Sequence, residues 1–263
     1  MKFRLSGPFE VVTDDGRVHA PRAPKVSRLL AVLALQPRTP VAVGTLVREL
    51  WGDDPPAGAP RTLQTHVYHA RRMLADLPCP PGRPLLVTDS PGYRLDVDDA
   101  DVDARVFELL VRRAQGERDA QLLDAASHHV TQALNLWRGP LLSNLPVGAV
   151  LAGRTVCLEE LRIRALELRV EIGAARGRSR HMLPDLRALV EEYPLHEWFH
   201  GQLIQALHQV GRRAEALRAY RNLYAVLRSE LGLEPSAELR RLHAEILGQA
   251  PATEQRRTAR EAA

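Results

Sequence analysis

At 263 residues, with 45% hydrophobic and 26% charged residues, the chain has the composition of a globular protein and the length of one large domain or two ordinary ones. No run of eighteen apolar residues occurs, and the first eight residues lack the apolar stretch of a secretory signal. We therefore expect a cytoplasmic protein without a membrane-spanning segment.

The net charge of +4 is unevenly distributed along the chain. Residues 1–95 hold 13 Lys and Arg against 8 Asp and Glu, whereas the remaining residues hold 23 against 24. A basic first third ahead of a near-neutral remainder predicts a module that binds a polyanion, joined to a second part of another kind.

Motifs that would indicate an enzyme or a metal site are missing from the sequence. There is no Walker A loop, no G-x-G-x-x-G after a strand and no H-E-x-x-H. Cys79 and Cys157 have no His or Cys at ligand spacing, so we expect neither a zinc site nor a disulfide, and Cys157 should pack as a small apolar residue of a helix. The neighbours in His128-His129 and in Glu159-Glu160 point about 100° apart on a helix, so solvated faces explain both pairs better than a site does. We expect no catalytic residue, no cofactor and no metal.

Short alternating apolar runs open the chain. Gly7-Pro8 and Asp14-Asp15-Gly16-Arg17 interrupt these runs, which predicts a small antiparallel sheet. Pro24 then begins a helix that extends from Lys25 to about Leu35. Lys25 and Arg28 lie in its first turn, where they suit phosphate contacts, although two solvated cations explain them equally well.

A helix-turn-helix follows this helix. Its first member ends at Gly52, as is typical of a C-cap glycine, and turns four apolar side chains inward, namely Leu46, Val47, Leu50 and Trp51. Its second member is predicted over residues 60–77, where Pro60 suits the first helical position and Pro78 and Pro80 end the helix. The second helix of such a pair is the one that enters the major groove of DNA.

The helix over residues 60–77 is amphipathic. Its apolar stripe follows the 3.6-residue period and consists of Leu63, Val67, Ala70, Leu74 and Leu77. Its other face carries cations, hydroxyls, an amide and rings, namely Arg61, Thr62, Gln64, Thr65, Tyr68, His69 and Arg72. Such a face suits phosphates and base edges, but most polar helix faces are merely solvated, so the neighbouring elements decide between the two interpretations.

Residues 85–97 predict a strand, a turn and a second strand. A hairpin directly after a helix-turn-helix is a wing, and Arg94 near its tip would reach the DNA backbone or the minor groove. A sheet, three helices and a hairpin in this order predict a winged helix with an N-terminal sheet, because five elements agree.

The second part of the chain is predicted to be all helical. An acidic, loop-like stretch from Asp96 to Asp103 marks the boundary, and helices are predicted at residues 103–115, 120–137, 153–176, 179–193, 196–210, 213–231 and 236–248. Gly177-Arg178 recurs as Gly211-Arg212 after 34 residues, and apolar positions recur with it: Leu183 with Leu217, Leu186 with Tyr220 and Leu189 with Leu223. This is the period of the tetratricopeptide repeat, whose helix pairs stack into curved surfaces that hold a partner, whereas two similar helices by accident are the alternative.

Several segments carry a resemblance to a known family. They are Phe3-Arg4-Leu5-Ser6-Gly7-Pro8-Phe9, Leu50-Trp51-Gly52-Asp53-Asp54-Pro55-Pro56, Thr62-Leu63-Gln64-Thr65-His66-Val67, Pro91-Gly92-Tyr93-Arg94-Leu95, Trp137-Arg138-Gly139-Pro140-Leu141 and Gly232-Leu233-Glu234-Pro235-Ser236. In this order and at this spacing, the chain resembles the Streptomyces antibiotic regulatory proteins over residues 2–248. We expect the last two segments to be structural corners, in which Gly and Pro turn the chain and Trp137 packs.

The resemblance implies a mainly α fold in two domains. An OmpR-type winged-helix DNA-binding domain, with its small β-sheet and wing hairpin, would occupy residues 1–97. A bacterial transcriptional activation domain built of tetratricopeptide-like helical repeats would occupy residues 103–248. Residues 249–263 are polar, and we expect a disordered tail.

The resemblance also implies a function. It is that of a transcriptional activator that binds direct repeats in promoter DNA as a homodimer or as side-by-side protomers. Such an activator recruits RNA polymerase through sigma region 4 and other subunits, and controls an antibiotic or other secondary-metabolite gene cluster. A protein-interaction scaffold and a repressor that occludes a promoter are the alternatives.

The candidate DNA-binding residues combine this resemblance with the charge pattern. They are Lys25, Arg28, Trp51, Arg61, Thr62, Thr65, Tyr68, His69, Arg71, Arg72 and Arg94. Family members often have Ser and Arg where this chain has Tyr68 and His69. His and Tyr make weaker and less selective base contacts than Arg, so the departure affects which operator is bound.

Overall fold

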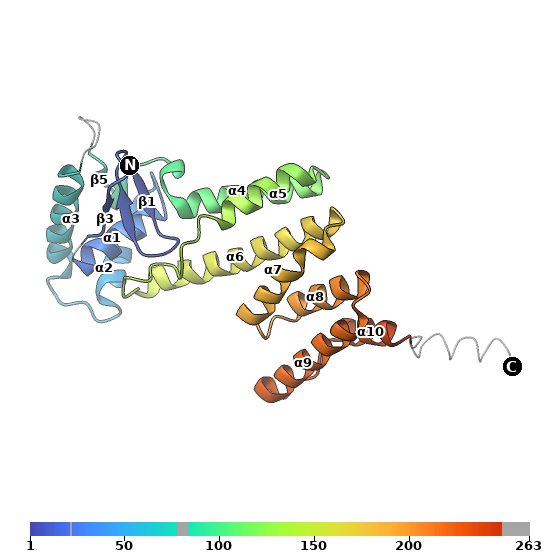
Figure 1. Cartoon of the computed structure of the whole chain (residues 1–263). Coiled ribbons are helices and arrows are strands. Elements are labelled where there is room, and N and C mark those ends of the chain that lie inside the picture. The colour runs from blue at the N-terminus through green and yellow to red at the C-terminus, as the bar shows by residue number, and fades with distance from the viewer. Residues whose placement is uncertain (22, 78–83, 249–263) are drawn as a thin grey trace. The chain divides into compact units, whose positions relative to one another are not determined.

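The computed structural model describes residues 1–21, 23–77 and 84–248 of the chain. The chain divides into two compact units, Met1–Leu166 and Glu167–Ala263. The first unit contains the elements from β1 (Lys2–Arg4) to α5 (Leu123–Leu134) and the first part of α6 (Ala149–Ala175). The second unit contains the rest of α6 and the helices from α7 (Ser179–Glu192) to α10 (Ala237–Leu247) (Figure 1). The described fold is mainly helical with small antiparallel sheets, as predicted.

The N-terminal sheet is antiparallel, with the strand order β1-β2-β3. Its strands are β1 (Lys2–Arg4), β2 (Glu10–Val12) and β3 (Val18–His19), and Phe3 lies opposite Val11. Phe3, Phe9 and Val11 are fully buried, which confirms the sheet that their alternation predicts.

Three helices and a second sheet complete the winged helix. The helices α1 (Pro24–Ala34), α2 (Val43–Trp51) and α3 (Ala59–Ala75) pack on one another, and Gly52 ends α2 with φ 76°, as its C-cap role predicts. The wing strands β5 (Leu86–Asp89) and β6 (Gly92–Leu95) form the predicted hairpin. The predicted helix stop at Pro78 and Pro80 lies outside the described residues.

A two-residue strand, β4 (Val41–Ala42), was not predicted. It pairs with β6, so that the second sheet has the order β4-β6-β5. Gly92 lies opposite Ala42, and a Cβ at this position would overlap the carbonyl of Val41. The glycine therefore allows the wing to pair closely with the chain that leads into α2.

Two helices follow in the same unit, α4 (Asp103–Asp119) and α5 (Leu123–Leu134), after a short 3₁₀ turn at Asp99–Asp101. Trp137 packs edge-on against Phe107 with ring centroids 5.4 Å apart, and the guanidinium of Arg162 lies 5.0 Å from the Trp137 ring. Gly139 has φ 145°, so this segment is the structural corner that was predicted.

Polar contacts join this corner and α4 to the N-terminal sheet. The carboxylate of Asp103 accepts the backbone N–H groups of Leu5 (2.7 Å) and Ser6 (3.0 Å). The amide of Asn144 bonds both the N–H and the C=O of Phe9 (2.7 and 3.2 Å). Burial raises the pKa of Asp103, and its three backbone N–H partners and Arg138 oppose that shift.

Glu49 of α2 is a buried carboxylate that caps another helix. Its side chain has no exposed surface and accepts the N–H groups of Gly148 (2.6 Å), Val150 (3.0 Å) and Leu151 (3.0 Å) at the start of α6. The guanidinium of Arg28 pairs with the same carboxylate at 3.1 Å. A carboxylate at a helix N-terminus satisfies N–H groups that have no partner within the helix and meets the positive end of the helix dipole.

The second unit consists of paired helices after the end of α6. They are α7 (Ser179–Glu192), α8 (Glu197–Gln209), α9 (Arg213–Leu231) and α10 (Ala237–Leu247), close to the predicted bounds. Within this unit α7 packs on α8 and α8 on α9. Leu183, Leu186 and Leu189 are buried on α7, as are Tyr220 and Leu223 at the matching positions of α9, while Leu217 is half-buried.

The 34-residue repeat is also present in the backbone. Gly177 (φ 69°) donates to Ala174 and Arg178 to Gly173; 34 residues later Gly211 (φ 81°) donates to His208 and Arg212 to Leu207. These two bonds define a Schellman turn. A third such turn joins α4 to α5, where Gln121 (φ 61°) donates to Arg118 and Leu122 to Glu117, and its lack of glycine hid it from the sequence pattern.

Two predictions about single side chains were wrong. Cys157 is exposed on α6 rather than packed, because Leu151, Leu158 and Ala165 form the buried stripe and Cys157 lies about 100° from it. The ring of His129 is not solvated but bonds the carboxylate of Glu117 at 2.6 Å, across the packed pair α4 and α5.

Two kinds of feature are absent from the described residues. No helix among them is long and apolar enough to cross a bilayer. Nor do they contain a group of three or more His, Cys, Asp or Glu side chains that could hold a metal ion.

Candidate nucleic-acid interface

Helix α3 separates an apolar face from an exposed polar face. Leu63, Val67, Ala70 and Leu74 are buried against the rest of the winged helix. The residues predicted to point outward are all exposed, namely Arg61, Thr62, Gln64, Thr65, Tyr68, His69 and Arg72. Tyr68 exposes 58% of its surface, much for an aromatic residue. In the first unit α3 lies at the edge farthest from α4 and α5 (Figure 1).

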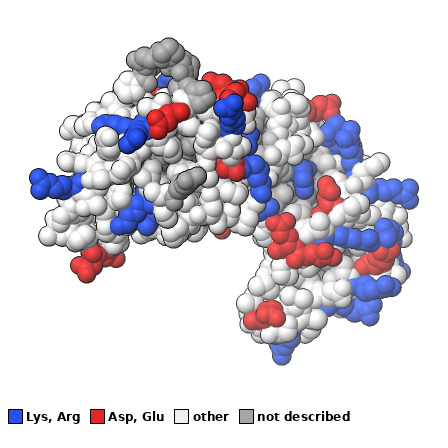
Figure 2. Space-filling view, turned by 60° about the vertical axis from the view of Figure 1, so that its left-hand side comes forward, with Lys and Arg blue, Asp and Glu red and all other residues white. Residues whose placement is uncertain are grey.

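Three cations on or beside this face have no acidic partner among the described residues. No carboxylate of a described residue lies within 4 Å of Lys25, Arg61 or Arg72. Figure 2 shows Lys and Arg side chains in separate patches over the N-terminal part of the molecule, on a surface that is largely uncharged. These three cations are therefore available to an external anion.

Lys25 belongs to a small cluster between α1, α2 and α3. Its ammonium lies 4.3 Å from the ring centroid of Trp51, and that ring lies 5.9 Å from the ring of His66. Trp51 is half-buried rather than fully inward, so its ring supports the Lys25 side chain by a cation–π contact. Burial lowers the pKa of His66, and the charges of Lys25 and His69 lower it further. His66 thus stays neutral beside Lys25 at neutral pH.

The side chain of Arg28 lies mostly in the protein interior. Its side chain is only 14% exposed and is paired with Glu49, so its charge is already balanced. Arg28 is therefore not available to bind a phosphate. The sequence pattern missed this pair because Glu49 carries a charge on a face that otherwise holds apolar residues.

Two arginines contact strand β5 of the wing. Arg71 of α3 donates from Nε to the carbonyl of Leu86 (2.9 Å) and from Nη2 to the hydroxyl of Thr88 (2.8 Å). Arg94 of β6 is half-buried and lies 3.2 Å from the carboxylate of Asp89 on the facing strand. Both guanidinium groups have partners within the winged helix.

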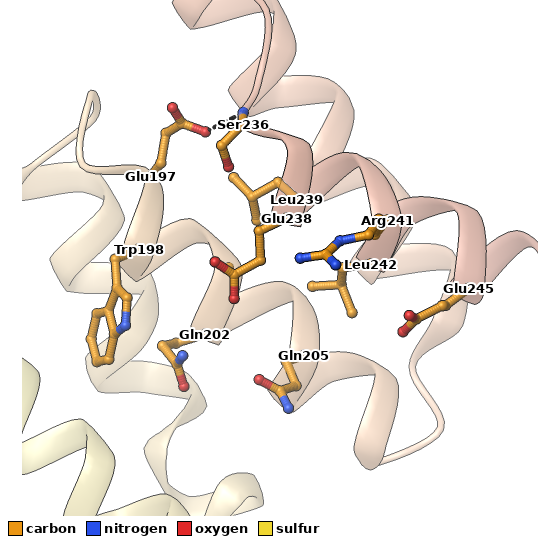
Figure 3. Close-up of a pocket in the computed structure, with 11 residues that line it drawn as sticks. Glu197, Trp198, Gln202, Gln205, Ser236, Glu238, Leu239, Arg241, Leu242 and Glu245 are labelled. Carbon is orange, nitrogen blue, oxygen red and sulfur yellow. Dashed lines mark hydrogen bonds between the residues drawn. The ribbon is translucent and has the colours of Figure 1, made fainter. Parts of the chain in front are cut away.

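The second unit has an open groove of about 450 Å³ between α8 and α10. Figure 3 shows Trp198, Gln202 and Gln205 on the α8 wall and Glu238 and Arg241 on the α10 wall. At one end the carboxylate of Glu197 accepts the backbone N–H of Ser236 (2.7 Å) and so holds the two helices together. Among these residues Ser236 belongs to the predicted corner Gly232–Ser236 of the sequence analysis.

Two protein-family models match the chain. One is described as "Transcriptional regulatory protein, C terminal" and matches residues 19–95, and the other is "Bacterial transcriptional activator domain", which matches residues 102–247. The first covers α1 to β6 and the second covers α4 to α10.

Curated relatives match over almost the whole chain. It is 39% identical to the regulatory protein DnrI of Streptomyces peucetius over 251 residues, which are 94% of this chain and 92% of DnrI. It is also 39% identical to the transcriptional regulator RedD of Streptomyces coelicolor over 256 residues, which are 95% of this chain and 71% of RedD.

A solved structure has the same fold. It is that of Mycobacterium tuberculosis EmbR in complex with a low-affinity phosphopeptide, with a TM-score of 0.85 and 33% identity. The match covers 95% of this chain and 65% of that chain.

Proposed function

This chain belongs to the Streptomyces antibiotic regulatory protein family of transcriptional regulators, and from that premise we propose that it binds promoter DNA sequence-specifically through α3 and activates transcription. The observation that carries the proposal is the exposed face of α3, where hydroxyls, rings and unpaired cations lie over a buried apolar stripe. Such a helix can insert its outer face into a major groove while the winged helix holds its inner face.

The exposed residues fall into two roles in this proposal. Lys25 and Arg61 bind phosphates and supply most of the affinity, which makes binding salt-dependent through counterion release. Thr65, Tyr68, His69 and Arg72 contact base edges. Arg72 has the strongest base preference of the four because a guanidinium can bond guanine O6 and N7 together.

The names of the relatives support a role in transcriptional regulation. DnrI is called a regulatory protein, RedD a transcriptional regulator, and the second family model a transcriptional activator domain. We propose that side-by-side protomers of this chain occupy direct repeats in the cytoplasm and recruit RNA polymerase through sigma region 4 and other subunits. The controlled genes would form an antibiotic or other secondary-metabolite cluster.

Selection followed by transcription tests this proposal. Duplexes that bind the full chain would be selected from a random library and placed upstream of a promoter in a run-off assay with purified RNA polymerase. Enrichment of a direct repeat and a higher transcript yield are expected. A lower yield would favour the repressor alternative, and failure to enrich any sequence would favour a protein-interaction scaffold.

A further inference from the structure

The guanidinium of Arg71 joins the recognition helix to the wing. It donates two hydrogen bonds to β5, to the Leu86 carbonyl at 2.9 Å and to the Thr88 hydroxyl at 2.8 Å. Arg71 was predicted to bind DNA because it is a cation of α3, and its side chain is indeed exposed. Two of its donors, Nε–H and Nη2–H, nevertheless point at the protein.

The bonds fall on the free edge of the second sheet. In the order β4-β6-β5, one side of β5 pairs with β6 and the other side has no neighbouring strand among the described residues. The carbonyl of Leu85 faces β6, since it accepts the N–H of Asp96 at 2.7 Å. The carbonyl of the next residue, Leu86, therefore points to the free edge, because successive carbonyls of a strand alternate. Arg71 occupies the place that a further strand would take.

The fork shape of the side chain suits this task. Leu86 and Thr88 are two residues apart on β5, and the rigid guanidinium presents Nε–H and Nη2–H in one plane to both acceptors. On its other side the wing is fixed by the pairing of β6 with β4, next to α2. The wing is thus held from both halves of the helix-turn-helix.

We propose that Arg71 is a positioning residue that holds the wing in a fixed position relative to α3, so that the helix and the wing contact the DNA as one rigid surface. The proposal rests on the function proposed above, and it removes Arg71 from the phosphate-binding set. Arg72, the next residue, has no such partner in the described chain and keeps its role in DNA contact.

Hydrogen exchange of the free protein tests, without DNA, the tether, by which we mean the two hydrogen bonds from Arg71 to β5. Arg71→Ala should make the amides of residues 86–95 exchange about tenfold faster, because part of the edge support of β5 is lost. Thr88→Val removes one acceptor without changing charge and should give a smaller increase. Arg72→Ala is the matched control and should leave this segment unchanged. Unchanged exchange in Arg71→Ala would overturn the proposal.

Binding to a selected duplex tests the consequence. Arg71→Ala should weaken binding about five- to tenfold and Thr88→Val less. The double variant should be no weaker than Arg71→Ala, because Thr88→Val removes one of the two hydrogen bonds that Arg71→Ala removes together. A salt slope reduced by about one in Arg71→Ala, together with no effect of Thr88→Val, would place the guanidinium on a phosphate instead. Two separate losses that add in the double variant would also contradict the proposal. If the unaltered chain selects no duplex, the proposed function fails, while the exchange result still decides whether the tether exists.

Discussion

At the scale of single residues, the buried carboxylate of Glu49 is the most consequential feature outside the interface. It has four partners in the first unit: three backbone N–H groups of α6 and the guanidinium of Arg28. Removing a buried charge leaves its partners unsatisfied, which costs more than the net value of the contact. Gly148 belongs to the same arrangement, because a Cβ there would overlap Glu49 and Arg28.

Glu49→Ala should lower the free energy of unfolding by about 3–5 kcal/mol. The substitution leaves the guanidinium of Arg28 without its carboxylate partner and removes the acceptor of the first N–H groups of α6. Urea denaturation of the full chain, followed by circular dichroism, measures the loss. Arg48→Ala, at the exposed neighbouring position of α2, is the control and should change stability by less than about 0.5 kcal/mol. Equal effects of the two substitutions would show that the cap is not stabilising.

His200 should make the second unit sensitive to mild acid. Burial lowers the pKa of its imidazole below the usual 6.5, while the Pro194 carbonyl, 3.0 Å away, and Glu197 oppose the shift. Above pH 6.5 both the folded and the unfolded states carry neutral imidazole, so the stabilisation is complete. As the pH falls below 6.5 the unfolded chain takes up a proton first, and stability is lost until the pH has passed the lowered pKa of the folded state.

His200→Gln should therefore reduce the pH dependence of the urea midpoint between pH 6.5 and 5. Glutamine keeps a donor for the Pro194 carbonyl and does not titrate. His208→Gln, at an exposed position of the same helix, provides the comparison. An unaltered pH dependence in His200→Gln would contradict the assignment.

The sequence predicts side chains well where the helical period decides their direction. The exposed residues of α3 and its buried stripe both follow from the 3.6-residue repeat. The same rule says nothing about partners distant in sequence. Arg28 and Arg71 looked like free cations because Glu49 and the Leu86 carbonyl reach them only in the folded chain.

At the scale of elements, the Schellman turns show where local sequence suffices. Glycine at 177 and 211 revealed two of the turns, but the same hydrogen bonds form at Gln121 without glycine. A non-glycine residue in the left-handed region is strained by roughly 1–2 kcal/mol, so the third turn depends on the packing of α4 on α5.

Gln121→Gly should relieve that strain and stabilise the chain by up to about 1 kcal/mol. The gain is smaller than the strain, because glycine also increases the conformational entropy of the unfolded chain. The reverse change at the matching turn, Gly211→Gln, should destabilise by a similar amount. Thermal unfolding of both variants measures the two shifts. A lower midpoint for Gln121→Gly would mean that the glutamine side chain contributes more than its backbone costs.

Helices were predicted more reliably than strands. Long periodic segments gave all the helices of the second unit within a few residues of their bounds. β4 has only two residues and exists because β6 pairs with it from fifty residues away, so no local pattern reveals it.

At the scale of the whole chain, the first compact unit extends past the end of the winged helix. Asp103, Asn144 and the start of α6 all bond to the N-terminal sheet or to α2. The domain boundary at residues 97–103 follows the sequence pattern and the family models, whereas the contacts divide the chain at Leu166. The winged helix therefore depends on residues outside the range that its sequence pattern defines.

A fragment of residues 1–97 should be less stable than a fragment of residues 1–166 by more than about 3 kcal/mol, because it lacks the three backbone N–H partners of Glu49 and the N–H acceptor Asp103. Urea denaturation of the two fragments measures the difference. Equal midpoints and slopes would show that the winged helix is self-sufficient.

In the proposed function, the outer face of α3 recognises DNA sequence. Its most direct test compares the affinity of the chain for a selected duplex and for a scrambled duplex of the same length and salt. Arg72→Ala should lose about 1–3 kcal/mol on the selected duplex and much less on the scrambled one, whereas Arg61→Ala should weaken both alike. Equal losses on the two duplexes for Arg72→Ala would contradict the claim.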